Sequence, residues 1–170
     1  AHALSEKSHT TVLEVNLDAM TRNLNRFRAR VGEGVKMIAM VKASSYGAGD
    51  FEVAQMLQHQ GVAMLAVAFA DEGVELRQKG ITMPIVVLNA DSDSFEQMIA
   101  YRLEPEIYSL HSLESFASAV AHAGEEHYPI HLKLDTGMHR LGFEKEEIDA
   151  LIERLDAMPQ VRVSSLFTHL

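Results

Sequence analysis

The sequence predicts an α/β protein with a parallel sheet, either a doubly wound open sheet or an incomplete (β/α) barrel of the TIM type. Short apolar runs alternate with helical patterns along almost the whole chain, which is typical of parallel strands joined by right-handed crossovers. The chain has 170 residues, whereas a closed barrel needs about 250. The turn after the first apolar run has a Gly-x-Gly spacing without the third glycine of a dinucleotide-binding fold.

The first element is a helix over residues 17–31. Its apolar residues recur at intervals of three and four, the period of a helix with one buried face: Leu17, Met20, Leu24, Phe27 and Val31. Asn16 stands where an N-cap is favoured, and Gly32 stands where helices commonly end. These positions predict both ends of the helix.

Six strands and five further helices follow in alternation. We expect the strands at 35–41, 64–69, 84–89, 104–109, 131–135 and 161–169, and the helices at 50–60, 71–79, 92–101, 112–123 and 144–157. Apart from Lys36 the first run is apolar, as in a strand buried on both faces. Six strands are about three quarters of a barrel. An open barrel exposes two sheet edges, so we expect the strand at 35–41 or the one at 161–169 to pair with another chain or to be disordered.

Composition narrows the possible functions. The net charge is −9 and the basic residues are scattered, which argues against nucleic acid and anionic membrane surfaces as partners. The absence of cysteine excludes disulfides and thiolate chemistry. The longest apolar stretch, 63–70, is too short to span a bilayer, and residues 1–10 lack the apolar core of a signal peptide. We therefore expect a cytoplasmic protein.

Lys42 is the leading candidate for chemistry. It ends the apolar run 35–41, at the strand edge where α/β proteins place their sites. Partial desolvation there would favour the neutral amine, which attacks carbonyl groups. A lysine that extends from the strand end into solvent is an equally good interpretation. Tyr46 lies in the same turn and could bind a phosphate beside a helix N-terminus, although a packed loop tyrosine is more common.

The segment 132–143 carries a second group of candidates. Lys133 and Asp135 alternate with leucines and point to one face of a strand, where buried charges must pair or be modified. Arg140 follows in the turn and suits a carboxylate or a phenolate oxygen, although a surface pair with Glu144 or Glu146 is more common.

Histidines give weaker signals. His169 ends the last expected strand, on the face that would carry the other candidates. The remaining histidines, including His122, His127, His131 and His139, lack the spacing of a metal site, so we interpret them as surface or core residues.

Together these segments resemble the alanine racemase family. The resemblance rests on NLDAMTRNL (16–24), MIAMVKASSYGAGD (37–50), FADEGVELRQKGI (69–81), PIVVL (84–88), HLKLDTGMHRLGF (131–143) and LFTHL (166–170). It implies a (β/α)₈ barrel that binds pyridoxal 5'-phosphate, of which residues 11–170 are about six strands. It also implies interconversion of L- and D-alanine for peptidoglycan synthesis, through a lysine aldimine of the cofactor, by a homodimer.

The resemblance also implies roles for single residues. Lys42 would hold the cofactor and act as one of two catalytic bases, and Tyr46 would bind the cofactor phosphate. Arg140 would contact the phenolic oxygen of the cofactor and the carboxylate of the substrate. Lys133 would be the lysine that is often carbamylated in this family. His169 would lie near the pyridine ring.

The chain departs from the family in sequence and length. Ser44 and Ser45 replace the usual Asn-Ala, Ala48 replaces a histidine, and His139 stands where glycine or asparagine is frequent. The KASSYGAG turn is similar to racemases fused behind a D-alanyl-D-alanine-adding ligase, which implies that residues 1–10 are a linker remnant. Family members are about twice as long and place the second base, a tyrosine, in the part without a counterpart here.

From this length and the resemblance we expect the chain to be an N-terminal fragment of a racemase. Alternatives are a non-catalytic single-barrel protein that binds pyridoxal phosphate, and an inactive structural fragment. Serine racemases share these motifs, so the resemblance does not separate alanine from serine.

Overall fold

The computed structural model describes residues 11–169, and the expected linker remnant at residues 1–10 lies outside this range. Six parallel strands form one sheet in chain order. They are β1 (Ile38–Met40), β2 (Met64–Val67), β3 (Ile85–Val87), β4 (Glu104–Ile107), β5 (Tyr128–Leu134) and β6 (Val161–Thr168). This order is that of a barrel. In a doubly wound sheet, later strands would be added on both sides of the first strand, so the spatial order would not follow the chain. The structure therefore confirms the incomplete TIM-type barrel.

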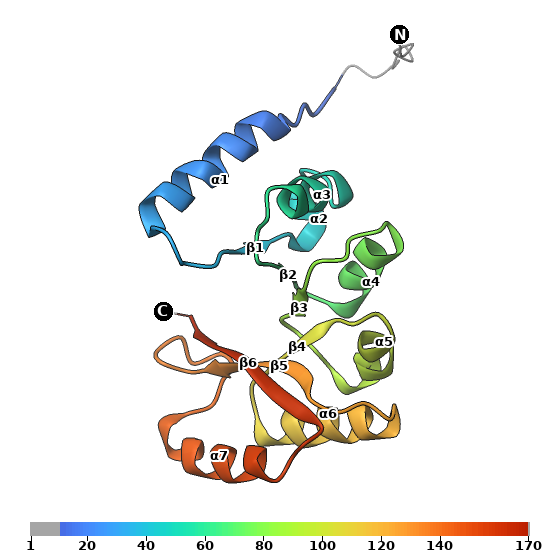
Figure 1. Ribbon diagram of the computed structural model, residues 1–170, viewed down its shortest axis with the longest axis vertical. Helices are drawn as coiled ribbons and strands as arrows, with labels where there is room; N and C mark the ends of the chain where they lie inside the picture. The colour runs from blue at the N-terminus through green and yellow to red at the C-terminus, as the bar shows by residue number, and fades with distance from the viewer. Residues whose placement is uncertain (1–10, 170) are drawn as a thin grey trace.

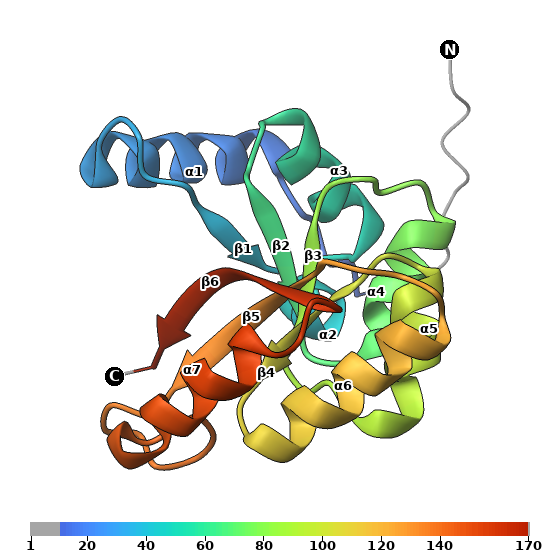
Figure 2. The ribbon, with the colours of Figure 1, turned by 60° about the horizontal axis from the view of Figure 1, so that its bottom comes forward.

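Helices follow the strands as expected. They are α1 (Leu17–Val31), α2 (Lys42–Tyr46), α3 (Phe51–His59), α4 (Ala70–Gln78), α5 (Phe95–Ala100), α6 (Leu110–His122) and α7 (Ile148–Asp156), with 3₁₀ turns η1 (Ser92–Ser94) and η2 (Lys145–Glu147). Helices α3 to α6 lie along one side of the sheet (Figure 1). Figure 2 shows the sheet curving between its end strands, β1 and β6.

The core lies between the helices and the outward faces of the strands. Leu65, Ile85, Ile107 and Ile130 are fully buried there, one from each of four strands. Residues one position along each strand point the opposite way, toward the inside of the curve. This alternation separates an apolar outer layer from an inner face that is free to carry polar groups.

Helix α1 has the predicted ends but packs less than predicted. The Asn16 side chain accepts a hydrogen bond from the Ala19 N–H at 2.9 Å, and Gly32 ends the helix. Leu24 is buried, whereas Phe27 and Val31 are 61% and 43% exposed. Figure 1 shows α1 standing apart from the other helices, so only part of its apolar face has a neighbour.

Two strand predictions need correction. Segment 35–41 is not buried on both faces: β1 has only three residues, and Ile38 and Met40 are 54% and 37% exposed. The reason is that Ile38 and Met40 point to the open inner face of the sheet, whereas only Ala39, in register with the buried Leu65, points toward the helices. Strand β5 starts at Tyr128, three residues earlier than expected, because Pro129 takes part in the strand although it cannot donate a ladder hydrogen bond.

Candidate active site

A cavity of about 440 Å³ lies inside the curve of the sheet, toward the carboxyl ends of the strands. Each strand, or the loop after it, contributes to its wall. The lining residues are Ile38, Met40, Lys42, Ala66, Ala68, Val86, Leu88, Asn89, Glu106, His131, Lys133, Arg140, Leu141, Ser165, Phe167, Thr168 and His169.

The cavity wall has an apolar and a polar part. The first three strands contribute small or aliphatic side chains such as Met40, Ala66 and Val86, whereas β4 and β5 contribute Glu106 and Lys133. A flat apolar group can pack on the first part while polar groups fix its orientation on the second, which is the usual design of a cofactor site.

Lys42 stands at the mouth of this cavity and is half-buried. It begins α2, a turn whose next four residues all have left-handed backbone angles, with φ between 51° and 58° from Ala43 to Tyr46. Non-glycine residues adopt this conformation at a cost of roughly 1–2 kcal/mol each. Such strain persists only where surrounding contacts impose it, and it is concentrated at functional sites.

Glu72 of α4 supplies one of those contacts. Its carboxylate accepts a hydrogen bond from the Ala43 N–H at 2.6 Å, and further bonds from the N–H groups of Ala68 and Phe69 at 2.7 and 3.0 Å. One side chain therefore joins the turn that carries Lys42 to the end of β2. Sequence reasoning missed this role, although Glu72 lies within the segment FADEGVELRQKGI.

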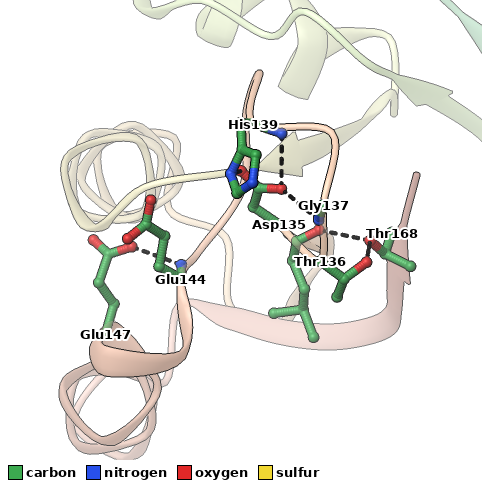
Figure 3. A network of polar contacts seen from close by, with 8 residues as sticks. Asp135, Thr136, Gly137, His139, Glu144, Glu147 and Thr168 are labelled. Atoms are coloured by element: carbon green, nitrogen blue, oxygen red, sulfur yellow. Dashed lines mark hydrogen bonds and ion pairs between the residues drawn. The ribbon is translucent and has the colours of Figure 1, made fainter. Parts of the chain in front are cut away.

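The loop after β5 brings Arg140 to the cavity. The Asp135 carboxylate accepts hydrogen bonds from the N–H groups of Gly137 and His139 at 3.1 and 3.0 Å, and these bonds hold the pKa of Asp135 below its usual value (Figure 3). Gly142 closes the loop at φ +132°, where an added Cβ would lie 2.6 Å from the Asp135 nitrogen. Asp135 thus shapes the loop instead of lining the cavity with Lys133.

Arg140 is exposed and lines the cavity. The surface pair considered from the sequence does not form: within residues 11–169, Arg140 has no ion pair within 4.0 Å with Glu144 or Glu146. Instead, Glu144 donates its N–H to Glu147 within the η2 turn, away from the Asp135 loop in Figure 3. The guanidinium is therefore available to an anionic ligand.

A buried polar row crosses the inner face of β4, β5 and β6. His131 Nε2 lies 2.7 Å from a carboxylate oxygen of Glu104, and His131 Nδ1 lies 2.7 Å from Ser165 Oγ. The pairing of β5 with β6 shifts by one residue between Ile130 and His131, because β6 has one extra residue there. His131 therefore lies opposite Ser165 and not Ser164. Bulges of this kind redirect side chains beside active sites. The sequence analysis left His131 as a surface or a core residue; it is buried, and it has a place in the cavity wall that the sequence did not indicate.

Lys133 and Glu106 form a second buried pair on the same face. Lys133 Nζ lies 3.8 Å from Glu106 Oε1, and the two side chains are 6% and 3% exposed. Burial raises the pKa of Glu106 from 4.5 to about 7, and the positive charges of Lys133 and Arg140 oppose that rise. The expectation that a buried Lys133 must pair or be modified is met here by a carboxylate that the sequence analysis did not single out.

The structure brings together four of the five predicted site residues. Lys42, Lys133, Arg140 and His169 all line the same cavity. Tyr46 does not: its side chain is 69% exposed and is absent from the cavity lining. Among residues 11–169, no helix is long and apolar enough to span a membrane. No cluster of three or more potential metal ligands occurs within that range either.

Comparison with known proteins identifies relatives of this chain. Residues 15–170 match the family model for "Alanine racemase, N-terminal domain". An alanine racemase of Synechocystis sp. is 36% identical over 160 residues, which are 93% of this chain and 43% of the relative. Alanine racemase 1 of Bacillus subtilis is also 36% identical, over 94% of this chain and 41% of the relative.

Solved structures agree with these sequence relatives. The alanine racemase of Clostridium difficile 630 superposes with a TM-score of 0.86 at 36% identity, covering 92% of this chain and 41% of that one. A complex of the same enzyme with cycloserine gives a TM-score of 0.87. The present chain therefore spans less than half the length of the relatives that it matches.

Proposed function

The chain belongs to the alanine racemase family, and from this premise we propose that it provides one half of the active site of an alanine racemase that uses pyridoxal 5'-phosphate. The observation that carries the proposal is the convergence of Lys42 and Arg140, from loops 98 residues apart, on one cavity at the carboxyl ends of the strands.

The donor set of the cavity fits this cofactor. A half-buried lysine suits its aldehyde, and an arginine suits its phenolate oxygen or a substrate carboxylate. Small and aliphatic side chains from β1 to β3, such as Ala66 and Met40, leave an apolar wall for a flat ring. His169 lines the same cavity, which supports a contact between this residue and that ring.

When bound, pyridoxal phosphate acts as the electron sink that makes the Cα proton of an amino acid acidic. The residues of this chain supply the binding and the proton transfer. Lys42 holds the cofactor, and its amine takes the Cα proton on one face of the substrate or returns it there. Arg140 binds the substrate carboxylate and so fixes which face Lys42 meets.

We assign Tyr46 to the phosphate on the basis of the family resemblance. Its exposed position at the end of α2 means that such a contact would form at the outer edge of the site. For the whole protein we propose L- and D-alanine as substrates, a cytoplasmic location, a homodimer, and a role in peptidoglycan synthesis. The second base of such an enzyme would come from residues other than those described here.

Titration with pyridoxal phosphate tests the proposal. The chain should develop the visible absorbance of lysine-bound pyridoxal. Lys42→Ala should abolish it because Lys133, the other lysine of residues 11–169 that lines the cavity, is buried in its pair with Glu106. Lys36→Ala is the matched control, since Lys36 is exposed and lies outside the cavity lining. Equal absorbance in wild type and Lys42→Ala would contradict the proposal.

A further inference from the structure

The polar wall of the cavity carries a cation with two partners. Glu106 of β4 is the register partner of His131 in β5. His131 stands two residues before Lys133, so both side chains lie on the same face of β5. This register places the Glu106 carboxylate 3.8 Å from Lys133 Nζ, with both side chains almost fully buried. A buried ammonium requires such compensation because water does not reach it.

The second partner comes from β6. Phe167 is the register partner of Lys133, and Lys133 Nζ lies 5.7 Å from the centre of the Phe167 ring. The face of an aromatic ring attracts a cation and repels an anion. The register shift after Ile130 produces this contact, since without it Phe167 would not stand beside Lys133.

We propose that Lys133 is kept as an unmodified ammonium in this protein, and that Glu106 is the residue that fixes this charge state. The negative charge beside Arg140 is then the carboxylate of Glu106 and not a carbamate on Lys133. The inference extends the proposed function at the same site, but it concerns only residues of this chain and does not require a bound cofactor.

The chemistry of carbamylation explains why the surroundings oppose it. The lysine nitrogen forms a bond to the carbon of carbon dioxide, two protons leave the former ammonium, and the side chain changes from a cation to an anion. That anion would meet the Glu106 carboxylate and the face of the Phe167 ring at close range. Arg140 is a positive group that would favour such an anion, but its charge already acts on the Glu106 carboxylate.

Carbon-13 NMR in the presence of labelled bicarbonate tests this inference on the full chain. Other amines can react, so wild type is compared with Lys133→Met in mildly alkaline buffer. We expect the two carbamate spectra to be identical. A resonance that is present in wild type and lost in Lys133→Met would overturn the proposal.

A second comparison tests the role of Glu106. Glu106→Gln keeps the size of the side chain and removes its charge, so Lys133 should become reactive and a new carbamate resonance should appear. The double variant Glu106→Gln/Lys133→Met should lose it. If Glu106→Gln fails to fold by circular dichroism, Glu106→Ser takes its place. A folded Glu106 variant without a new resonance would show that Glu106 does not fix the charge of Lys133.

These readouts are separate from the test of the proposed function. Failure of the chain to bind pyridoxal phosphate would leave the NMR comparisons intact. Conversely, a carbamate on wild-type Lys133 would leave the role of Lys42 unaffected, because Lys42 stands on a different strand end.

Discussion

At the scale of single residues, Glu106 should govern part of the pH dependence of stability. Its pKa is about 7 in the folded chain against an ordinary value of 4.5. Between these values the folded state binds a proton that the unfolded state has released, so the stability contributed by this group is present below pH 4.5 and is lost as the pH rises to about 7.

Glu106→Gln removes this titration and makes the effect measurable. Urea unfolding of both proteins across the range should show wild type losing about 3 kcal/mol relative to the variant between the two pKa values, and little change outside them. A difference between the two proteins that does not vary with pH would contradict the assignment of the raised pKa to Glu106.

At the scale of elements, the left-handed turn α2 depends on a helix that is distant in sequence. In the wild-type chain the two carboxylate oxygens of Glu72 accept hydrogen bonds from three N–H groups. Glu72→Gln leaves only one oxygen acceptor and removes its charge. Ala68 is half-buried, whereas Ala43 and Phe69 are exposed and water can replace the lost acceptor there, so the cost is about 1 kcal/mol, the low end of the range for such bonds. We expect Glu72→Gln to lower the free energy of unfolding by that amount and to slow the reaction of Lys42 with pyridoxal phosphate.

Glu75→Gln is the matched control on the same helix. Glu75 pairs at the surface with Lys79, and exposed pairs contribute roughly 1 kcal/mol or less. Glu75→Gln should therefore leave both the unfolding free energy and the reaction of Lys42 nearly unchanged. Equal behaviour of the Glu72 and Glu75 variants would mean that Glu72 does not hold the turn.

The elements also show how far the sequence could predict the site. The meeting of Lys42, Arg140 and His169 was predictable, because parallel strands bring the residues at their carboxyl ends to one edge. The partners of Lys133 and His131 were not, because they depend on strand register and on one extra residue in β6. The exposure of β1 was not predicted because an apolar run does not show whether a strand lies in the middle of a sheet or at its end, or whether its inner face is covered.

At the scale of the whole molecule, we assign one base, Lys42, to a reaction that needs two. Racemisation requires a proton acceptor on one face of the substrate and a donor on the other. No tyrosine of residues 11–169 lines the cavity. The other titratable groups on the polar wall are held in buried pairs: Lys133 with Glu106, and His131 with Glu104. Loss of a positioned acid or base typically costs about 10²–10⁴ in rate.

The 170-residue chain alone should therefore show negligible racemisation of alanine with excess pyridoxal phosphate. An assay coupled to D-amino-acid oxidase measures this directly, with a full-length relative as the positive control. Turnover comparable to that of the relative would show that this half of the site is sufficient, and would contradict the count of bases.

The central claim is that Lys42, and no other lysine, holds the cofactor. Reduction of the chain with borohydride in the presence of limiting pyridoxal phosphate fixes the cofactor to whichever lysine carries it, and peptide mass mapping then locates it. The chain has six lysines: Lys7, Lys36, Lys42, Lys79, Lys133 and Lys145. We predict modification of Lys42 nearly alone. Modification spread over the exposed lysines, with Lys42 no more reactive than Lys36 or Lys145, would contradict the account.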